Sequence, residues 1–583
     1  MRSQPARTLI GLALGLGGAA LVSPTSVPAA APRARIVDLQ PISGYSPFKP
    51  HGCGVPGSPT FDSEAEPSLA VNPRDPSNLV AVWQQDRFVS DGGALSNIAG
   101  VSRDGGRTWR SVLIPKLSRC TGGADERTSD PWVTIGPDGT TYLASLTFTE
   151  NPVLGAGGLA GPTNQVVSRS SDGGSTWANP VTVVNNGAYN DRQSIIADPF
   201  RPATAYEVWV DRLGAFGETG VNKFVSTVDG GRTFSSPLST YIAAPANLPD
   251  PTLVDVLRDG TLVNVFMLAN ISAVVGPKMP FQVMAMRSVD HGKTWSTPVK
   301  IAELPPLAPY DSDTNVQVRA FPDVSTATAP DGTLYVVWND IQSERRSSIR
   351  LSRSLDEGVT WSAPTDVRDL PAQAFLPSVA VDKRGVIGVM WDDFRHHKPG
   401  EKTLKTDVYF SASTDGGHTF RETHVAGPFD ASSASATSST GVAGRFLGDY
   451  QGFAALPSGF AAAFAQSGHT RGPSDIYFAR IKILATESLG IRLQIRPRRT
   501  VAGCRTRFTF TATSTTGRRV PGALIRIAGR RLKTSRQGSA TATLTFNRPG
   551  NYRVLALFAG LRTGRATIRV IPQPPKHDRP TDR

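Results

Sequence analysis

Polar residues that could bind or transform a charged substrate recur in this 583-residue chain just before or just after short apolar runs. Arginine can bind a carboxylate through two parallel hydrogen bonds. A carboxylate or a tyrosine can act as acid, base or nucleophile at a sugar. Our candidates for catalytic residues are Arg127, Arg192, Arg319, Arg445, Tyr450 and Asp130. If they converge in the fold, these residues could act on a glycan.

A second set of polar residues follows tryptophan at the end of apolar runs. Similar copies in different parts of the chain favour a structural role, in which the aspartate caps a loop. These residues are Asp86 with Arg87, Asp211 with Arg212, Asp340, and Asp393 with Arg395. Other polar residues, Glu66, Asp191 and Asp449, lie in the segments that precede the runs.

Six copies of the pattern Ser/Thr-x-Asp-x-Gly-x-Thr-Trp/Phe are spaced along the chain and must help to position these residues. The aspartate can accept hydrogen bonds from backbone amides just ahead of it and so close a turn. Glycine adopts φ > 0 at little cost, and the aromatic ring buries a large apolar surface. We therefore predict structural turns at Asp104, Asp172, Asp229, Asp290, Asp356 and Asp415.

Seven predicted β-hairpins alternate with the six turns, beginning with "EPSLAVNPRDPSNLVAVWQQD" at Glu66 and ending with "GDYQGFAALPSGFAAAFAQ" at Gly448. One hairpin and the two strands around a turn make a four-stranded unit, which is typical of a propeller blade. The seventh unit lacks an outer strand, which residues 34–42 could supply and so remove the open edges. We therefore predict an all-β propeller of seven blades, in preference to six. The catalytic candidates should lie on the face opposite the aspartate turns.

The six turns match the Asp-box, or bacterial neuraminidase repeat, and residues 34–484 resemble the sialidase superfamily. The phrases "WDDFR" (391–395), "TDVYFSASTDGGHTF" (406–420) and "FLGDYQG" (446–452) resemble secreted bacterial proteins described as sialidase-like. The resemblance implies a β-propeller and a glycoside hydrolase of the sialidase type.

The family's catalytic residues do not carry over one by one, because no motif in this sequence places its tyrosine nucleophile, the paired glutamate or the acid/base aspartate. Its Arg-Ile-Pro motif is absent, and Tyr450 lies late in the chain, as the family's tyrosine does. Because Asp-boxes also occur in propellers without sialidase activity, the sequence leaves open whether the chain is an enzyme.

The N-terminus has the order of a secretory signal, with Arg2 and Arg7, an apolar stretch from Leu9 to Val22, and small residues at 29–31. We expect residues 1–31 to be a signal peptide, no membrane span, and a secreted protein. In an oxidising compartment Cys53 and Cys120 could form a disulfide, and Cys504 would be left as a small buried residue. "YDSDTN" (310–315) could hold a structural calcium ion, although a polar loop is favoured. We expect no other cofactor.

The composition changes after residue 484, where short alternating runs predict an immunoglobulin-like β-sandwich over 485–571 and a disordered tail over 572–583. From Leu484 onward there are 21 Lys and Arg against three Asp and Glu, a net charge of +18. The whole chain carries +14, so the part before Leu484 carries −4.

A basic unit on a secreted protein suggests anionic polymers of the cell surface as partners. No nucleic-acid motif is present. Three functions therefore compete for a propeller over 32–484, which we expect to be monomeric. One is a hydrolase that acts on glycans at the cell surface. The alternative is a non-catalytic propeller that binds glycan or protein and is anchored to the envelope by the basic unit. The third is a scaffold.

Overall fold

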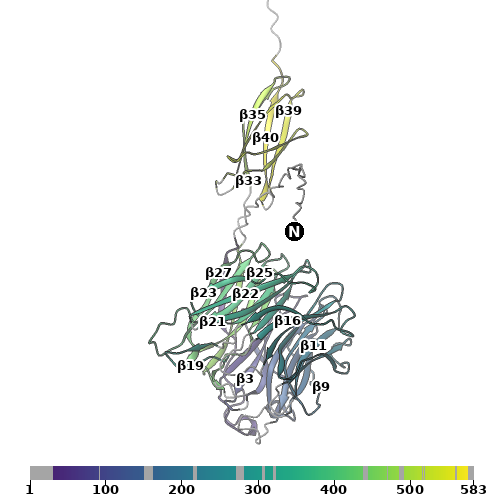
Figure 1. Cartoon of the computed structure of the whole chain (residues 1–583), viewed down its shortest axis with the longest axis vertical. Helices are drawn as coiled ribbons and strands as arrows, with labels where there is room; N and C mark the ends of the chain where they lie inside the picture. The colour runs from purple at the N-terminus through teal and green to yellow at the C-terminus, as the bar shows by residue number, and fades with distance from the viewer. Residues whose placement is uncertain are drawn as a thin grey trace, which may run out of the picture. The chain divides into compact units, whose positions relative to one another are not determined.

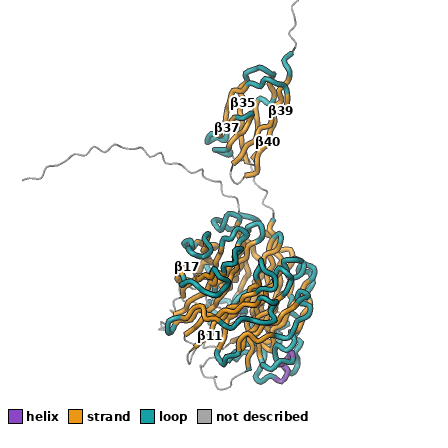
Figure 2. Tube along the Cα trace, turned by 90° about the vertical axis from the view of Figure 1, so that its right-hand side faces the viewer, coloured by secondary structure: helices purple, strands orange, loops and turns teal. Residues whose placement is uncertain are grey.

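The computed structural model describes residues 31–574 except 91, 150–161, 214–218, 271–280, 305–308, 320–322, 344, 438–443, 469–470, 485–490, 515–516, 518 and 559–560. The signal peptide predicted for 1–31 and the tail predicted for 572–583 lie almost wholly outside these residues. The chain divides into one compact unit of Ala30–Ala485 and another of Met1–Ala29 with Thr486–Arg583. The described residues of both units form an all-β structure (Figure 2). None of their helices is long and apolar enough to cross a membrane.

Seven four-stranded antiparallel sheets follow one another along the described part of the first unit, and we number them sheets 1 to 7. Sheets 1 and 2 are joined by a single pairing, between Ala94 and Thr128. Sheet 1 holds β2 (Glu64–Val71), β3 (Leu79–Arg87), β4 (Ala94–Ser102) and β5 (Arg110–Leu113). Sheet 2 holds β6 (Arg127–Ile135), β7 (Thr141–Phe148), β8 (Asn164–Ser170) and β9 (Val181–Val184). Sheet 3 holds β10 (Tyr189–Ala197), β11 (Ala205–Leu213), β12 (Thr219–Thr227) and β13 (Leu238–Ile242).

The next three sheets repeat this order. Sheet 4 holds β14 (Asn247–Val256), β15 (Leu262–Asn270), β16 (Phe281–Ser288) and β17 (Val299–Leu304). Sheet 5 holds β20 (Val324–Thr328), β21 (Leu334–Ser343), β22 (Arg346–Ser354) and β23 (Thr365–Leu370). Sheet 6 holds β24 (Ala374–Val381), β25 (Ile387–Asp393), β26 (Lys405–Ser413) and β27 (Arg421–Asp430).

Sheet 7 combines the two ends of the first unit. It holds β30 (Gly452–Leu456), β31 (Gly459–Ser467), β32 (Ser474–Ile483) and β1 (Ala34–Pro41), and β1 pairs antiparallel with β32. Among the described residues, two short hairpins and three 3₁₀ turns lie between the sheets: β18 (Tyr310–Asp311) with β19 (Val316–Gln317), β28 (Ala436–Thr437) with β29 (Gly444–Arg445), η1 (Gly52–Gly54), η2 (Arg119–Thr121) and η5 (Ala431–Ser433).

The first strands of the seven sheets form a closed ring, which makes the unit a β-propeller. Each first strand contacts the first strands of the two neighbouring sheets, and β30 contacts β2 to complete the circle. Figure 1 shows the sheets following the chain around this unit, from purple β3 through teal β16 to green β25. All seven first strands line one axial cavity of about 210 Å³.

Small hydroxyl side chains join neighbouring first strands around the axis. The backbone amide of Val133 donates to Ser68 Oγ (3.1 Å) and that of Ala197 donates to Thr134 Oγ1 (3.1 Å). Ser194 Oγ donates to the Thr252 carbonyl (3.0 Å). These bonds satisfy polar groups that the ring removes from water. The second strands are apolar and almost wholly buried because neighbouring sheets cover both of their faces.

The six aspartate turns join the third and fourth strands of sheets 1 to 6. In each turn the aspartate Oδ1 accepts from the backbone amide of the threonine four residues later, at 2.9–3.1 Å. The turn also touches the preceding sheet: the Trp109 ring lies 5.1 Å from that of Phe478, and the Trp295 ring 5.5 Å from that of Phe224. Glycine permits this approach, because a Cβ on Gly292 (φ +88°) would lie 2.2 Å from Phe224. The turns therefore stabilise the outer edges of the sheets.

The second unit is a β-sandwich with its own core. One sheet holds β33 (Ile491–Arg496), β35 (Thr506–Ser514) and β38 (Ser539–Leu544). The other holds β34 (Arg499–Val501), β40 (Leu561–Ile571), β39 (Gly550–Phe558), β36 (Leu524–Ile527) and β37 (Arg530–Lys533). Phe508, Phe510, Ile525, Val554 and Ile568 pack between the sheets.

The three cysteines lie in loops or short turns. Cys53 and Cys120 form a disulfide that joins η1 to η2. The expectation that Cys504 is buried is wrong, since its residue is exposed. Its backbone amide donates to the Val501 carbonyl (3.1 Å), and this turn after β34 lies outside the core of the sandwich.

We predict that Asp229→Ala lowers the free energy of unfolding by about 1–3 kcal/mol, because the amides of Arg232 and Thr233 lose their charged acceptor. Hydrogen bonds lower the pKa of Asp229 to about 2 although burial opposes them. Its contribution should therefore be present above the unfolded-state pKa of about 3.9 and disappear as the pH falls through about 2. Urea unfolding at pH 7 and pH 2 measures both effects. Val228→Ala, at an exposed neighbouring position, is the control, and an equal loss in the control would contradict the prediction.

Candidate functional site

A local backbone irregularity directs charged residues toward one end of the axis. In β2, β6 and β10 the pairing register shifts at the same place, and there Glu66, Asp130 and Arg192 have φ of 53°, 49° and 56°. A non-glycine residue with positive φ is costly and usually serves a purpose. Leu376 in β24 has the same conformation, so the irregularity is a feature of the fold and does not require a charged residue. The residue type at each of these positions then decides which chemical group it places near the axis.

The resulting group, which we call the axial cluster, lies at the end of the axis opposite the aspartate turns. It draws on six of the seven sheets or the segments that lead into them. Its members are Glu66, Arg87, Asp130, Asp191, Arg192, Arg212, Asp250, Arg319, Asp323 and Asp449.

Arg192 is the centre of the axial cluster. Its Nη1 lies 2.9 Å from Asp449 Oδ2, its Nε 3.2 Å from Asp250 Oδ1, and its Nη2 3.5 Å from Asp323 Oδ2. These carboxylates come from three different sheets, so a single guanidinium ties together the segments leading into sheets 4, 5 and 7. Its side chain is 10% exposed, and all three of its guanidinium nitrogens face these carboxylates.

Three other arginines surround this centre. Arg212 pairs with Asp191 (2.7 Å) and also with Asp250. Arg319 Nη2 lies 3.6 Å from Asp449 Oδ2, and the guanidinium of Arg87 stacks on the Phe446 ring at 3.8 Å. The side chains of Arg212 and Arg319 are each 14% exposed, whereas Arg87 is fully buried.

The carboxyl groups of the cluster differ in pKa. Burial raises the pKa of Asp130 to about 6, against the opposing effect of Arg192, and raises that of Asp323 to about 7. Burial and the charge of Asp130 raise the pKa of Glu66 well above its usual range. Arg319 and Arg192 outweigh burial at Asp449 and lower its pKa. The cluster therefore holds carboxyl groups that carry a proton near neutral pH beside one that stays ionised.

Tyr450 lies between the axial cluster and the axial cavity. Its hydroxyl donates to the Pro131 carbonyl at 2.9 Å, and its ring lies 4.9 Å from that of Trp132. Burial and the charge of Glu66 raise its pKa well above the usual value. A tyrosine nucleophile needs a base or a lowered pKa, so this environment does not favour a nucleophilic role for Tyr450 among our catalytic candidates.

The structure brings together only some of the residues predicted from the sequence. Asp130, Arg192, Arg319 and Tyr450 meet at the axis. Arg127 is buried outside the axial cluster, where it donates to the carbonyls of residues 90 and 92 and stacks on Phe88 at 3.6 Å.

Arg445 does not join the ion pairs of the axial cluster either. Its side chain donates to the Ala434 carbonyl (3.1 Å), and its own carbonyl accepts from the Arg319 amide (2.8 Å). Arg445 therefore supports the backbone that presents Arg319.

Among the aspartates after tryptophan, Asp393 caps a loop, as we favoured from the sequence, because it accepts from the Arg395 amide (3.0 Å). Asp86 and Asp340 instead make structural contacts with residues outside their own loops. Asp393 accepts from the Trp391 indole (3.0 Å) and pairs with Arg395 (2.6 Å). Asp86 accepts from the Asp62 amide (2.8 Å), and Asp340 pairs with Arg350 (3.2 Å). Arg87 and Arg212 differ, because their guanidinium groups reach the axial cluster.

Sequence reasoning missed Asp250 and Asp323 as site residues. Each lies where a linking segment enters a first strand, as Glu66 and Asp130 do. A signal was available: a charged residue beside a proline at that position, in "EPSL", "DPWV", "DPTL" and "FPDV". Aligning the seven hairpins by this position would have selected both aspartates.

No model of a protein family and no curated protein matches the chain. Among solved structures, it is similar to a protein of unknown function from Dyadobacter fermentans DSM 18053, at 14% identity over 77% of this chain and 99% of that one, with a TM-score of 0.42. It is also similar to a Penicillium chrysogenum α-L-arabinanase complexed with arabinobiose (15% identity, 66% and 99%, TM-score 0.42). A third is the NanB sialidase from Streptococcus pneumoniae (12% identity, 62% and 70%, TM-score 0.39). All three TM-scores lie below 0.5, so these similarities carry no inference about activity.

We predict that Arg192→Met destabilises the protein by about 3–5 kcal/mol at pH 8, because three buried carboxylates lose their shared cation. Without the cation the folded-state pKa values of all three should rise, including that of Asp449, which Arg319 and Arg192 hold below its usual value. The loss should therefore grow as the pH increases from 5 to 8, since the unfolded state then releases protons that the folded state retains. Chemical unfolding at several pH values measures it. Arg346→Met, which breaks an exposed pair with Asp369, should cost less than about 1 kcal/mol at every pH.

Proposed function

We propose that the chain is a secreted, seven-bladed propeller of the sialidase-like type that acts on glycans through the axial cluster. The proposal rests on two carboxyl groups near Arg192, those of Asp130 and Asp449, whose pKa values the site shifts in opposite directions. The pKa of Asp130 is raised to about 6 by burial, whereas that of Asp449 is lowered by Arg319 and Arg192. Such a division suits a general acid beside an ionised carboxylate, as glycoside hydrolysis requires.

The gathering of the partly exposed Arg192, Arg212 and Arg319 at one end of the axis supports an acidic sugar as the substrate. Guanidinium groups bind carboxylates in a planar, two-bond geometry. The cluster has six carboxyl groups and four guanidinium groups, so an added sugar carboxylate is best accommodated when Asp130, Glu66 or Asp323 carries a proton. Acidic glycans should therefore bind better below pH 6 than above it.

We predict that the protein hydrolyses a fluorogenic sialoside or an acidic oligosaccharide, with a rate that falls as the pH rises through about 6 and Asp130 loses its proton. Asp130→Asn should lower kcat at least 100-fold. Asp290→Asn, in an aspartate turn on the opposite face, is the matched control and should retain the rate. Full activity of Asp130→Asn would contradict the assignment.

A second candidate function is glycan binding without catalysis. The observation that favours it is that the arginines of the cluster are already paired with carboxylates of the chain itself. Binding to a glycan array without release of any sugar would select this function. Absence of both binding and turnover would reject a glycan role for the cluster.

We also propose that the second unit, an immunoglobulin-like module, docks the protein on anionic polymers of the envelope. Its charge of +18 supports this, as do the exposed Arg526, Arg530, Arg531 and Arg536. Export through the predicted signal peptide would place both units outside the cell, an environment in which the disulfide of Cys53 and Cys120 is stable.

We predict that the full chain sediments with purified bacterial envelope at 0.05 M salt and that this binding is lost at 1 M salt, where the Debye length shrinks to about 3 Å. The double substitution Arg530→Gln and Arg531→Gln should weaken binding severalfold, whereas Lys300→Gln in the first unit should not. Binding that does not depend on salt would reject docking by charge.

A further inference from the structure

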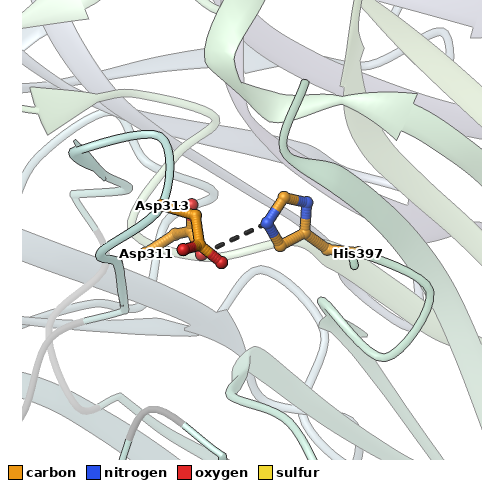
Figure 3. A group of neighbouring side chains, drawn as sticks. All are labelled: Asp311, Asp313 and His397. Carbon is orange, nitrogen blue, oxygen red and sulfur yellow. Dashed lines mark ion pairs between the residues drawn. The ribbon is translucent and has the colours of Figure 1, made fainter. Parts of the chain in front are cut away.

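Three potential metal ligands from two distant parts of the chain meet away from the axial cluster. Asp311 ends β18 and Asp313 lies in the turn before β19, whereas His397 lies in the connection from β25 to β26 in sheet 6. One ligand atom of each residue lies within 4.8 Å of the other two. Figure 3 shows both carboxyl groups facing the imidazole of His397.

The hydrogen bonding of His397 identifies the nitrogen that is available to a metal. Nδ1 lies 3.0 Å from the Thr403 carbonyl, and a carbonyl can only accept, so Nδ1 carries the proton. In a neutral imidazole Nε2 then holds a lone pair. Nε2 is buried, has no hydrogen-bond partner among the described residues, and lies 3.3 Å from Asp311 Oδ1. The side chain is only 7% exposed, so water does not readily compensate.

A lone pair that faces a carboxylate oxygen is unfavourable unless a cation lies between them. The arrangement around the two groups is typical of metal ligands. The Nδ1–H bond to a carbonyl orients a metal-binding histidine, and the second oxygen of Asp311 accepts from the Thr314 amide at 2.7 Å. The hydrogen bonds to Thr403 and Thr314 therefore hold His397 Nε2 and Asp311 Oδ1 facing each other without a contribution from Asp313.

The ligand types distinguish between metals. Calcium prefers six to eight oxygen ligands, which argues against the calcium site considered for residues 310–315. One imidazole nitrogen and two carboxylates suit Zn²⁺, with bonds of about 2.0–2.2 Å. In a tetrahedral Zn²⁺ site the ligand atoms lie about 3.3–3.6 Å apart, and Nε2 and Oδ1 of this pair lie 3.3 Å apart.

We propose that Asp311, Asp313 and His397 bind a Zn²⁺ ion, with water as the fourth ligand. The exposed carboxylate of Asp313 closes on the ion from the solvent side, whereas Asp311 and His397 are held in place. The ion fastens the β18–β19 hairpin to sheet 6, next to the bonds that Gln373 makes with the backbone of Tyr310. The same hairpin leads directly to Arg319, so the ion also steadies a segment of the axial cluster.

The alternative without metal is a protonated His397 paired with Asp311, and binding measurements on the full chain separate the two. Protein without a histidine tag is treated with EDTA, dialysed, and titrated with Zn²⁺ in competition with a chromophoric chelator. We expect one Zn²⁺ per chain, a higher Tm with Zn²⁺ than after EDTA, and no effect of millimolar Ca²⁺.

Asp313→Asn changes an exposed turn residue and should weaken Zn²⁺ binding at least tenfold while the Tm after EDTA stays unchanged. His397→Ala should abolish binding. His396→Ala is the matched control, because the neighbouring imidazole bonds to Asp407 outside this group, and it should bind Zn²⁺ as the wild type does. The proposal would be overturned if the wild type does not bind Zn²⁺, or if Asp313→Asn and His397→Ala bind Zn²⁺ as tightly as the wild type does. Stabilisation by Ca²⁺ instead of Zn²⁺ would overturn the choice of metal.

Discussion

Closure of the ring is the constraint on which the rest of the first unit depends. The strand β1, from the start of the described chain, pairs with β32, more than four hundred residues later, and fills the outer position of sheet 7. Without this pairing β32 would present an open edge, and β30 would have no fixed place beside β2. The hydroxyl bonds between first strands and the axial cavity are consequences of a ring that closes.

The ring determines what kind of chemistry its axis can hold. The first strands of sheets 1, 2, 3, 4 and 6 shift register at the same place, and the chain places a charged residue there in sheets 1 to 4 but leucine in sheet 6. The charges lie too close together to remain independent. Arg192 therefore pairs with three carboxylates, and burial raises the pKa of two further carboxyl groups, Glu66 and Asp130. A cluster of this kind stabilises the ring and also holds acids of different strength at one place.

The two faces of the propeller are specialised in different ways. The aspartate turns repeat almost unchanged, and each satisfies its own backbone and contacts the preceding sheet. The opposite face carries the linking segments, which differ from sheet to sheet and include the β18–β19 hairpin with its carboxylates. The turns that stabilise the fold are therefore nearly identical in sequence, whereas the segments that carry the candidate ligand-binding residues differ from sheet to sheet.

The sequence by itself determined the turns and hairpins, because these elements depend only on residues that are close together in the chain. The six turns follow from hydrogen bonds within five residues, such as those that Thr233 donates to the Asp229 carboxylate, and the hairpins follow from apolar runs separated by turn residues. It also indicated which face would carry Arg192, Arg319 and Asp130. Only the tertiary structure decided that Arg127 and Arg445 bond to backbone carbonyls, that Asp250 and Asp323 complete the axial cluster, and that His397 faces Asp311. These contacts join residues of different sheets, and they depend on how the ring closes and on the register shifts in the first strands of sheets 1 to 4 and 6, which no short stretch of sequence specifies.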